Sequence, residues 1–105
     1  MPAYVISTMA INDPETYRKY TALTPPTVKR HGGRFLTRGD EVFTMEGAPF
    51  GDRMVILEFP SKAAVDAWMG DPDYLAAAEF RHASSEARIL VQEGRSNTED
   101  PDPKV

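Results

Sequence analysis

The heptapeptide RMVILEF, residues 53–59, is the strongest strand signal in the chain. Its centre, residues 54–57, is apolar without interruption, and such a run is typical of a central strand buried on both faces. A strand of this kind needs hydrogen-bonding neighbours and a cover on each side. The rest of the sequence is therefore expected to supply further strands and the helices that pack on them.

Other segments of the chain also predict strands. In residues 3–11, both alternating sets of side chains are largely apolar, which indicates a strand covered on both faces. Gly39-Asp40 predicts a tight turn that pairs the segments before and after it in antiparallel fashion. The expected strands are 3–11 (AYVISTMAI), 34–38 (RFLTR), 41–46 (EVFTME), 53–59 (RMVILEF) and 86–93 (EARILVQE).

A first helical region is expected after residue 12. Asp13 is a suitable cap for the free amides of the first turn, and Pro14 fits the first helical position. The sequence Thr24-Pro25-Pro26 is expected to interrupt the helix, because proline lacks the amide hydrogen and restricts the residue before it. A further turn over 27–31 would follow at a changed angle, ended by Gly32-Gly33.

A second helical region is expected after the strand 53–59. Ser61 is its cap, and an apolar stripe runs from Ala63 to Trp68. Gly70 ends this first piece. Asp71-Pro72 then starts another helix by the same logic as Asp13-Pro14, and that helix is expected to reach about Ser84.

The expected order of the main elements is β-α-β-β-α-β, with a hairpin in the middle. This is the ferredoxin-like arrangement of the α+β class. Right-handed crossovers would place both helical regions on one face of a four-stranded antiparallel sheet. We expect a second copy of the chain to cover the other face, since two-fold dimers are the commonest oligomers. The two sheets would then enclose the core of a dimeric α+β barrel.

Length and composition limit the classes of protein to consider. The chain has 105 residues, a net charge of −4 and no cysteine. We expect one domain over 1–94 and a disordered tail over 95–105, which is polar and contains two prolines. The acidic balance argues against nucleic acid and anionic membranes as partners, and no apolar run is long enough for a membrane helix. A cytoplasmic location fits the lack of cysteine.

Short segments spread over residues 3–94 carry, in their order and spacing, a resemblance to a known family. They are Pro25-Pro26, 31–36 (HGGRFL), Arg38-Gly39, Glu46-Gly47, 56–61 (ILEFPS), Ala67-Trp68, 71–74 (DPDY), Arg81 and 91–94 (VQEG). Together they resemble the small bacterial proteins grouped as domain of unknown function 1330. The resemblance implies a dimeric α+β barrel of ferredoxin-like subunits. That superfamily also holds cofactor-free monooxygenases, muconolactone isomerases and dye-decolourising peroxidases. Asp40, Met69 and Asp73 depart from the family's usual residues.

Glu58 and Arg38 are the candidate catalytic residues. Glu58 follows the apolar run of a central strand, where a carboxylate is either solvated at the strand's end or buried and paired. It could be a general base or substrate anchor, or half of a structural ion pair. Arg38 and Arg34 are expected on one face of their strand, where Arg38 would bind a carboxylate ligand in a bidentate fork. The alternative is an arginine that protects an edge strand.

Candidate ligand-binding residues occur in the second helical region. Tyr74 and Arg81 are seven residues apart and so share a helix face, where they would line the mouth of a cleft or form an interface pair. Trp68 is interpreted as a packing residue in the cleft wall. Tyr17 and Tyr20 are interpreted as core residues with hydroxyls that reach water.

From these residues the sequence predicts a protein that binds a small polar or carboxylate-bearing metabolite in a cleft between helices and sheet. In an enzymatic version, Glu58 would act as base, and Arg38 or Arg81 would stabilise an enolate or carboxylate. No cofactor is expected. His31 and His82 do not have the spacing of metal ligands, so no metal site is expected either. The alternative is a non-catalytic dimer that binds a metabolite or a protein.

Overall fold

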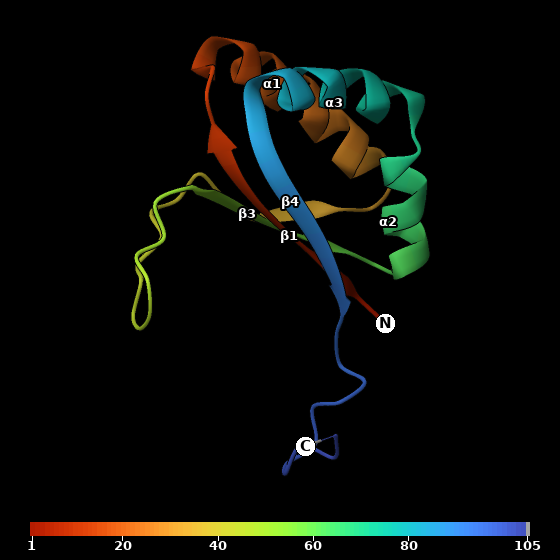
Figure 1. The fold of residues 1–105 in the computed structure, drawn as a ribbon. Helices are drawn as coiled ribbons and strands as arrows, with labels where there is room; N and C mark the ends of the chain where they lie inside the picture. The colour runs from red at the N-terminus through yellow and green to blue at the C-terminus, as the bar shows by residue number, and fades with distance from the viewer. Residues whose placement is uncertain (105) are drawn as a thin grey trace.

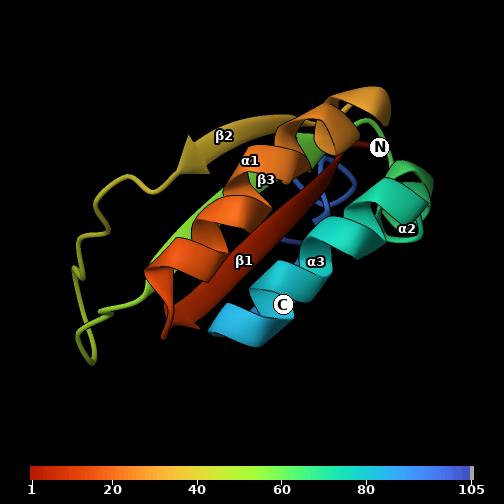
Figure 2. The same cartoon turned by 90° about the horizontal axis from the view of Figure 1, so that it is seen from above.

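The computed structural model describes residues 1–104 as a four-stranded antiparallel sheet with helices packed on one face (Figures 1 and 2). Two-residue periodicity along the strands and apolar stripes along the helices bring the large side chains together between the two layers. In chain order the elements are β1 (Ala3–Ile11), α1 (Pro14–Arg30), β2 (Arg34–Arg38), β3 (Arg53–Phe59), α2 (Lys62–Met69), α3 (Pro72–Ser84) and β4 (Ser85–Glu93).

The strands lie in the order β2-β3-β1-β4. Strand β1 pairs with β3 and with β4, and β2 pairs with β3, all antiparallel. Strands β1 and β3 are therefore the two central strands of the sheet, as their largely apolar composition predicts. This order and the helices on one face confirm the ferredoxin-like α+β fold expected from the sequence.

Each helix begins at the cap that the sequence indicates. The side chain of Asp13 accepts a hydrogen bond from the Thr16 amide at 3.3 Å, and Ser61 Oγ accepts one from the Ala64 amide at 3.1 Å. Asp71 accepts one from the Asp73 amide at 2.8 Å. These bonds satisfy amides that have no partner inside the first turn. The starts of α1, α2 and α3 are thus fixed by local chemistry.

Helix α1 runs without interruption through Pro25-Pro26, so the expected break there is wrong. Two threonine hydroxyls donate to carbonyls around the prolines: Thr24 Oγ1 to the Tyr20 carbonyl at 2.7 Å and Thr27 Oγ1 to the Thr24 carbonyl at 2.6 Å. Thr24, Thr27 and Val28 are also buried against the rest of the fold. Tertiary packing of this face of α1 therefore outweighs the local penalty of the prolines.

Burial distinguishes the two faces of the sheet. On β1, Val5, Ser7 and Met9 are buried under the helices, whereas Ile6 is only half-buried on the other face. Ile6 pairs there with Ile56 on one side and Leu90 on the other, and Leu90 is 51% exposed. We call this row of three residues the open-face row. These three apolar residues lie on the face of the sheet that the chain's own helices do not cover.

Residues 39–52 form an arm that extends from the end of β2 to the start of β3 (Figure 1). The strand expected over 41–46 is absent from this arm, so that prediction is wrong. Phe43 is 72% exposed and Met45 is 91% exposed, so the alternating pattern here has no surface to pack on. A strand without a packed face or a neighbouring strand is marginal at best in water.

After β4 the described part of the tail, residues 94–104, contains no helix or strand and extends away from the sheet (Figure 1). Within residues 1–104, no helix is long and apolar enough to span a membrane.

Candidate functional site

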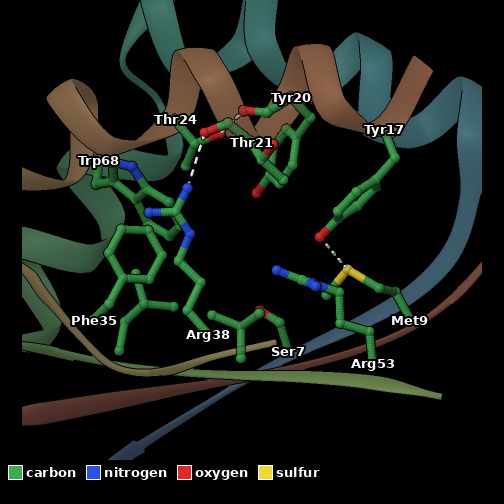
Figure 3. A pocket seen from close by; sticks show the side chains of 12 residues that line it. Ser7, Met9, Tyr17, Tyr20, Thr21, Thr24, Phe35, Arg38, Arg53 and Trp68 are labelled. Atoms are coloured by element: carbon green, nitrogen blue, oxygen red, sulfur yellow. Dashed lines mark hydrogen bonds between the residues drawn. The ribbon is translucent and has the colours of Figure 1, made fainter. Parts of the chain in front are cut away.

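A cleft lies between helix α1 and the face of the sheet that the helix covers (Figure 3). Its inner part is a cavity of about 30 Å³, and its outer part is a groove of about 370 Å³. The two parts share Tyr17, Thr21, Arg38 and Arg53, so they form one continuous cleft. The inner cavity is lined by Ser7, Met9, Tyr17, Tyr20, Thr21, Thr24, Phe35, Arg38, Arg53, Val55, Leu57 and Trp68.

Two arginines flank the inner cavity from opposite sides (Figure 3). Arg38 lies over the ring of Phe35, 4.6 Å from its centroid, and its Nη2 donates a hydrogen bond to the Thr21 carbonyl at 3.1 Å. Arg53 lies over the ring of Tyr17, 5.6 Å from its centroid. The Nε of Arg53 is buried and has no hydrogen-bond partner among the described residues.

No acidic side chain lines the cleft itself, while Asp40, Glu41 and Asp52 line a neighbouring surface hollow on the other side of Arg53. None of the twelve side chains that line the inner cavity is acidic, and in the described part of the chain neither Arg38 nor Arg53 forms an ion pair. Arg18 adds a third guanidinium at the outer groove. In a chain of net charge −4, this cleft is a local concentration of positive charge. Such an arrangement favours an anion.

The tyrosine hydroxyls of the cleft are donors and not bases. Tyr17 donates to the Met9 sulfur at 2.8 Å, and burial raises the pKa of Tyr17 against the opposing effect of Arg53. Burial, with the nearby Tyr74 hydroxyl, raises the pKa of Tyr20 well above its usual range. Both phenols therefore stay protonated at neutral pH. Tyr17 already donates its one proton to Met9, so Tyr20 is the phenol that can donate to an anion, with Tyr74 as the donor in the bond between the two hydroxyls.

Trp68 forms one wall of the inner cavity, and the structure brings it together with Arg38. Its ring packs between Phe59 and Tyr74, with centroids 5.1 Å and 4.3 Å away. Its indole nitrogen donates to Thr27 Oγ1 at 3.0 Å. Trp68 is 2% exposed, so it is fixed in place by packing and by this bond.

Tyr74 and Arg81 lie behind the cleft and not at its mouth. They do share a face of α3, and both contact Tyr20 of α1: the Tyr74 hydroxyl is 3.1 Å from that of Tyr20, and the Arg81 guanidinium is 5.7 Å from the centre of its ring. Both residues are buried. Tyr74 and Arg81 therefore affect the cleft indirectly, because they hold the Tyr20 side chain in place.

Glu58 lies on the opposite face of the sheet from the cleft. It forms an ion pair with Arg34, whose Nη2 is 2.8 Å from Oε1. Hydrogen bonding by Tyr4 and then by Arg34 lowers the pKa of Glu58. The structure does not bring Glu58 and Arg38 together.

A β-bulge separates Arg34 from Arg38. The pairing of β2 with β3 shifts between Phe35 and Thr37, so that Arg34 pairs with Glu58 while Arg38 pairs with Val55. Val55 faces the helices, and Arg38 does so too. The expectation that Arg34 and Arg38 share a face is wrong, because the extra residue reverses the alternation.

Arg53 is the residue of this cleft that the sequence reasoning missed. The signal was present, because Arg53 is in the same alternating set as Val55 and Leu57, which face the helices. The sequence predicts Tyr17 and Tyr20 as core residues with hydroxyls that reach water, and the structure shows that they also line the cavity.

The histidines and acidic residues do not gather into a metal site in residues 1–104. His31 instead contacts Asp71, with Nε2 2.7 Å from Oδ2, and Arg30 contacts the same oxygen at 2.8 Å. This group ties the end of α1 to the start of α3. It lies outside the set of residues that line the cleft.

Comparison with known proteins gives a family and a fold. The family described as Domain of unknown function (DUF1330) matches residues 2–95. No curated protein matches the chain in sequence.

Solved structures with similar folds share little sequence with this chain. RPA0582, a protein of unknown function from Rhodopseudomonas palustris, is 22% identical over 90% of this chain and 83% of its own, with a TM-score of 0.76. A dimeric ferredoxin-like protein of unknown function from Jannaschia sp. CCS1 is 15% identical, over 90% of this chain and 100% of its own, with a TM-score of 0.71. SnoaB, a cofactor-independent oxygenase from Streptomyces nogalater, is 15% identical, over 92% and 96%, with a TM-score of 0.62. At these identities the likeness concerns the fold alone.

Proposed function

The chain belongs to the family described as Domain of unknown function (DUF1330), and from that premise we propose that it binds a small carboxylate-bearing molecule in the cleft between α1 and the sheet. The family description names no reaction, so the proposal rests on the cleft itself. The carboxylate would lie in the inner cavity between Arg38 and Arg53, and the rest of the ligand would occupy the outer groove.

One observation carries this proposal. The Arg53 Nε is buried without a hydrogen-bond partner in residues 1–104, across the inner cavity from the Arg38 guanidinium, and no acidic side chain lines this cavity. A buried donor of a charged group without a partner is costly, so a ligand that accepts from it gains the bond and relieves this cost. A carboxylate matches the planar fork of arginine, because its two oxygens accept two parallel N–H bonds.

The side chains that line the cleft indicate the chemistry of the ligand beyond its carboxylate. Phe35, Leu57 and Trp68 give the inner cavity an apolar lining, and the groove of about 370 Å³ is at the small end of ligand pockets. A ligand of one ring or a short chain fits this space. Tyr20 would donate to the bound anion, with Tyr74 and Arg81 as its positioning residues.

A catalytic version of the proposal uses the same two arginines to stabilise an enolate. Two neighbours of this fold are described as a cofactor-independent oxygenase and a putative antibiotic biosynthesis monooxygenase. In this chain, however, the expected base Glu58 is on the other face, and the tyrosines of the cleft are held protonated. Binding is therefore the function that the geometry favours, and Glu58 has no part in it.

We extend the proposal to a homodimer in which a second copy covers the open-face row. Two structural neighbours, from Jannaschia sp. CCS1 and Bacteroides fragilis, are described as dimeric. Ile6, Ile56 and Leu90 provide the apolar contact that such an interface needs.

The binding proposal is tested with benzoate and its neutral isostere benzamide. We expect benzoate, followed by NMR titration of the ¹⁵N-labelled protein, to shift amides of the cleft at millimolar concentration, and benzamide to bind at least about 10-fold more weakly, because it lacks the charge that the arginines recognise. Arg38→Gln and Arg53→Gln should each weaken benzoate binding by about 10-fold or more.

Glu58→Gln is the matched control, since this variant also replaces a charged group of the sheet by an amide, but on the opposite face. It should leave benzoate binding unchanged. Equal binding of benzoate and benzamide, or full benzoate affinity in Arg53→Gln, would contradict the proposal.

A further inference from the structure

Helix α1 presents a carbonyl to the cleft that has no donor within the helix. In an α-helix, the amide of each residue donates to the carbonyl four positions earlier. Pro25 has no amide hydrogen, so the carbonyl of Thr21 lacks that partner. Thr21 lines both parts of the cleft, and Arg38 Nη2 donates to its carbonyl at 3.1 Å. Figure 3 shows this bond crossing from β2 to α1.

The second proline of the pair frees a different carbonyl with a different environment. Pro26 removes the helical donor of the Ala22 carbonyl, and Ala22 is exposed on the outer side of α1. The two prolines are adjacent and chemically identical, yet only Pro25 leaves its acceptor facing an arginine of the cleft.

We infer that Pro25 is a positioning residue for Arg38: it keeps the Thr21 carbonyl available, and the guanidinium bound there is held at the side of the anion cavity. The bond to Thr21 and the contact with the Phe35 ring fix one end of the guanidinium. A guanidinium has five N–H donors, so most of them remain for a ligand. The effect of Pro25 on the order of Arg38 does not depend on the proposed function, whereas its effect on ligand binding does.

Fixing this side chain has a defined advantage. Arg38 is exposed, and a long exposed side chain that must be ordered on binding reduces affinity. Because the Thr21 carbonyl already orders Arg38 in the free protein, that loss does not recur when a ligand arrives. An alanine at position 25 would restore the helical donor to the Thr21 carbonyl, which would then share its oxygen between that amide and Arg38 and bind Arg38 less strongly.

The test compares Pro25→Ala with Pro26→Ala. Both substitutions favour a helix, so both variants are expected to fold. The first readout needs no ligand: the NMR order parameter of the Arg38 side-chain Nε–H. We expect it to fall in Pro25→Ala toward the value of Arg18, an exposed arginine of α1, and to stay unchanged in Pro26→Ala. An unchanged order parameter in Pro25→Ala, or an equal fall in both variants, would overturn the inference.

The second readout is the dissociation constant of benzoate. We expect Pro25→Ala to weaken it by about 2- to 10-fold, the range expected when one long side chain loses its order. Pro26→Ala should bind as the unchanged protein does. If the unchanged protein does not bind benzoate, the proposed function fails, while the order parameter of Arg38 still decides the role of Pro25. If Arg38 loosens and benzoate affinity is unchanged, the positioning of Arg38 for ligand is refuted.

Discussion

Gly33 illustrates how closely single residues are fitted at the sheet edge. A Cβ atom at this position would lie 2.5 Å from Cε1 of Phe59, a distance that side chains do not tolerate. Phe59 is fully buried and packs on Trp68, which lines the cleft, so it has little freedom to move away. The glycine is needed here for the space it leaves.

We predict that Gly33→Ala lowers the free energy of unfolding by about 1–3 kcal/mol, the usual cost of inserting an atom into a packed core. Urea denaturation measures it. Gly51→Ala is the control, because nothing lies within 4 Å of a Cβ placed there. That variant should stay within about 1 kcal/mol of the unchanged protein. A Gly33→Ala protein as stable as the control would refute the packing argument.

Among single residues, the sequence predicts well which residue types would recognise an anion. It predicts less well in which direction their side chains point. Arg38 and Trp68 line the cleft, and Arg53 could have been added from the alternation of β3. The side of β2 from which Arg38 projects could not be predicted, because a one-residue bulge has no local signature in RFLTR.

At the scale of elements, the starts of the helices were predictable because Asp13, Ser61 and Asp71 act through bonds within a few residues. Two other expectations failed because their outcome depends on distant contacts. Pro25-Pro26 does not break α1, which is held by buried threonines, and 41–46 forms no strand, since nothing packs on it. Propensity and capping rules therefore predict a helix or strand correctly only where contacts with distant residues do not change the outcome.

The contact between α1 and α3 predicts a dependence of stability on pH. His31, the Asp73 amide and Arg30 bind the Asp71 carboxylate and lower its pKa from 3.8 to about 2. Since the folded pKa is below the unfolded one, this contribution to stability is complete above about pH 4. It is lost as the pH falls toward 2.

Urea denaturation of the unchanged protein and of Asp71→Asn, between pH 7 and pH 2, tests this expectation. The difference in unfolding free energy between the two should shrink as the pH falls from about 4 toward 2. Other carboxylates with lowered pKa values, such as Asp13, affect both proteins alike and cancel in the difference. A difference that does not change with pH would exclude a role for the Asp71 charge.

At the scale of the whole molecule, the helices cover one face of the sheet (Figure 2), and the open-face row lies on the face that they leave uncovered. Leu90 of this row is 51% exposed, and Leu75 of α3, outside the row, is 52% exposed. The two leucines are a matched pair, because a charge at either costs a single chain about the same. Only a partner that covers the sheet would distinguish them.

We predict that light scattering at micromolar concentration gives the unchanged protein twice the mass of one chain. Leu90→Lys should shift the mass to that of one chain, because a lysine would be buried without a partner in the interface. Leu75→Lys should remain a dimer. A single-chain mass for the unchanged protein would count against the second copy.

The extra residue in β2 decides what an aligned arginine means in a relative of this chain. Because side chains alternate, a homologue whose β2 is shorter by one residue would direct the arginine aligned with Arg38 away from α1, even if every neighbouring letter were identical. The length of this strand would therefore distinguish homologues whose arginine points toward α1 from those whose arginine does not, which conservation of the arginine alone cannot do. Strand length is the property to compare when asking which members of the family share this chemistry.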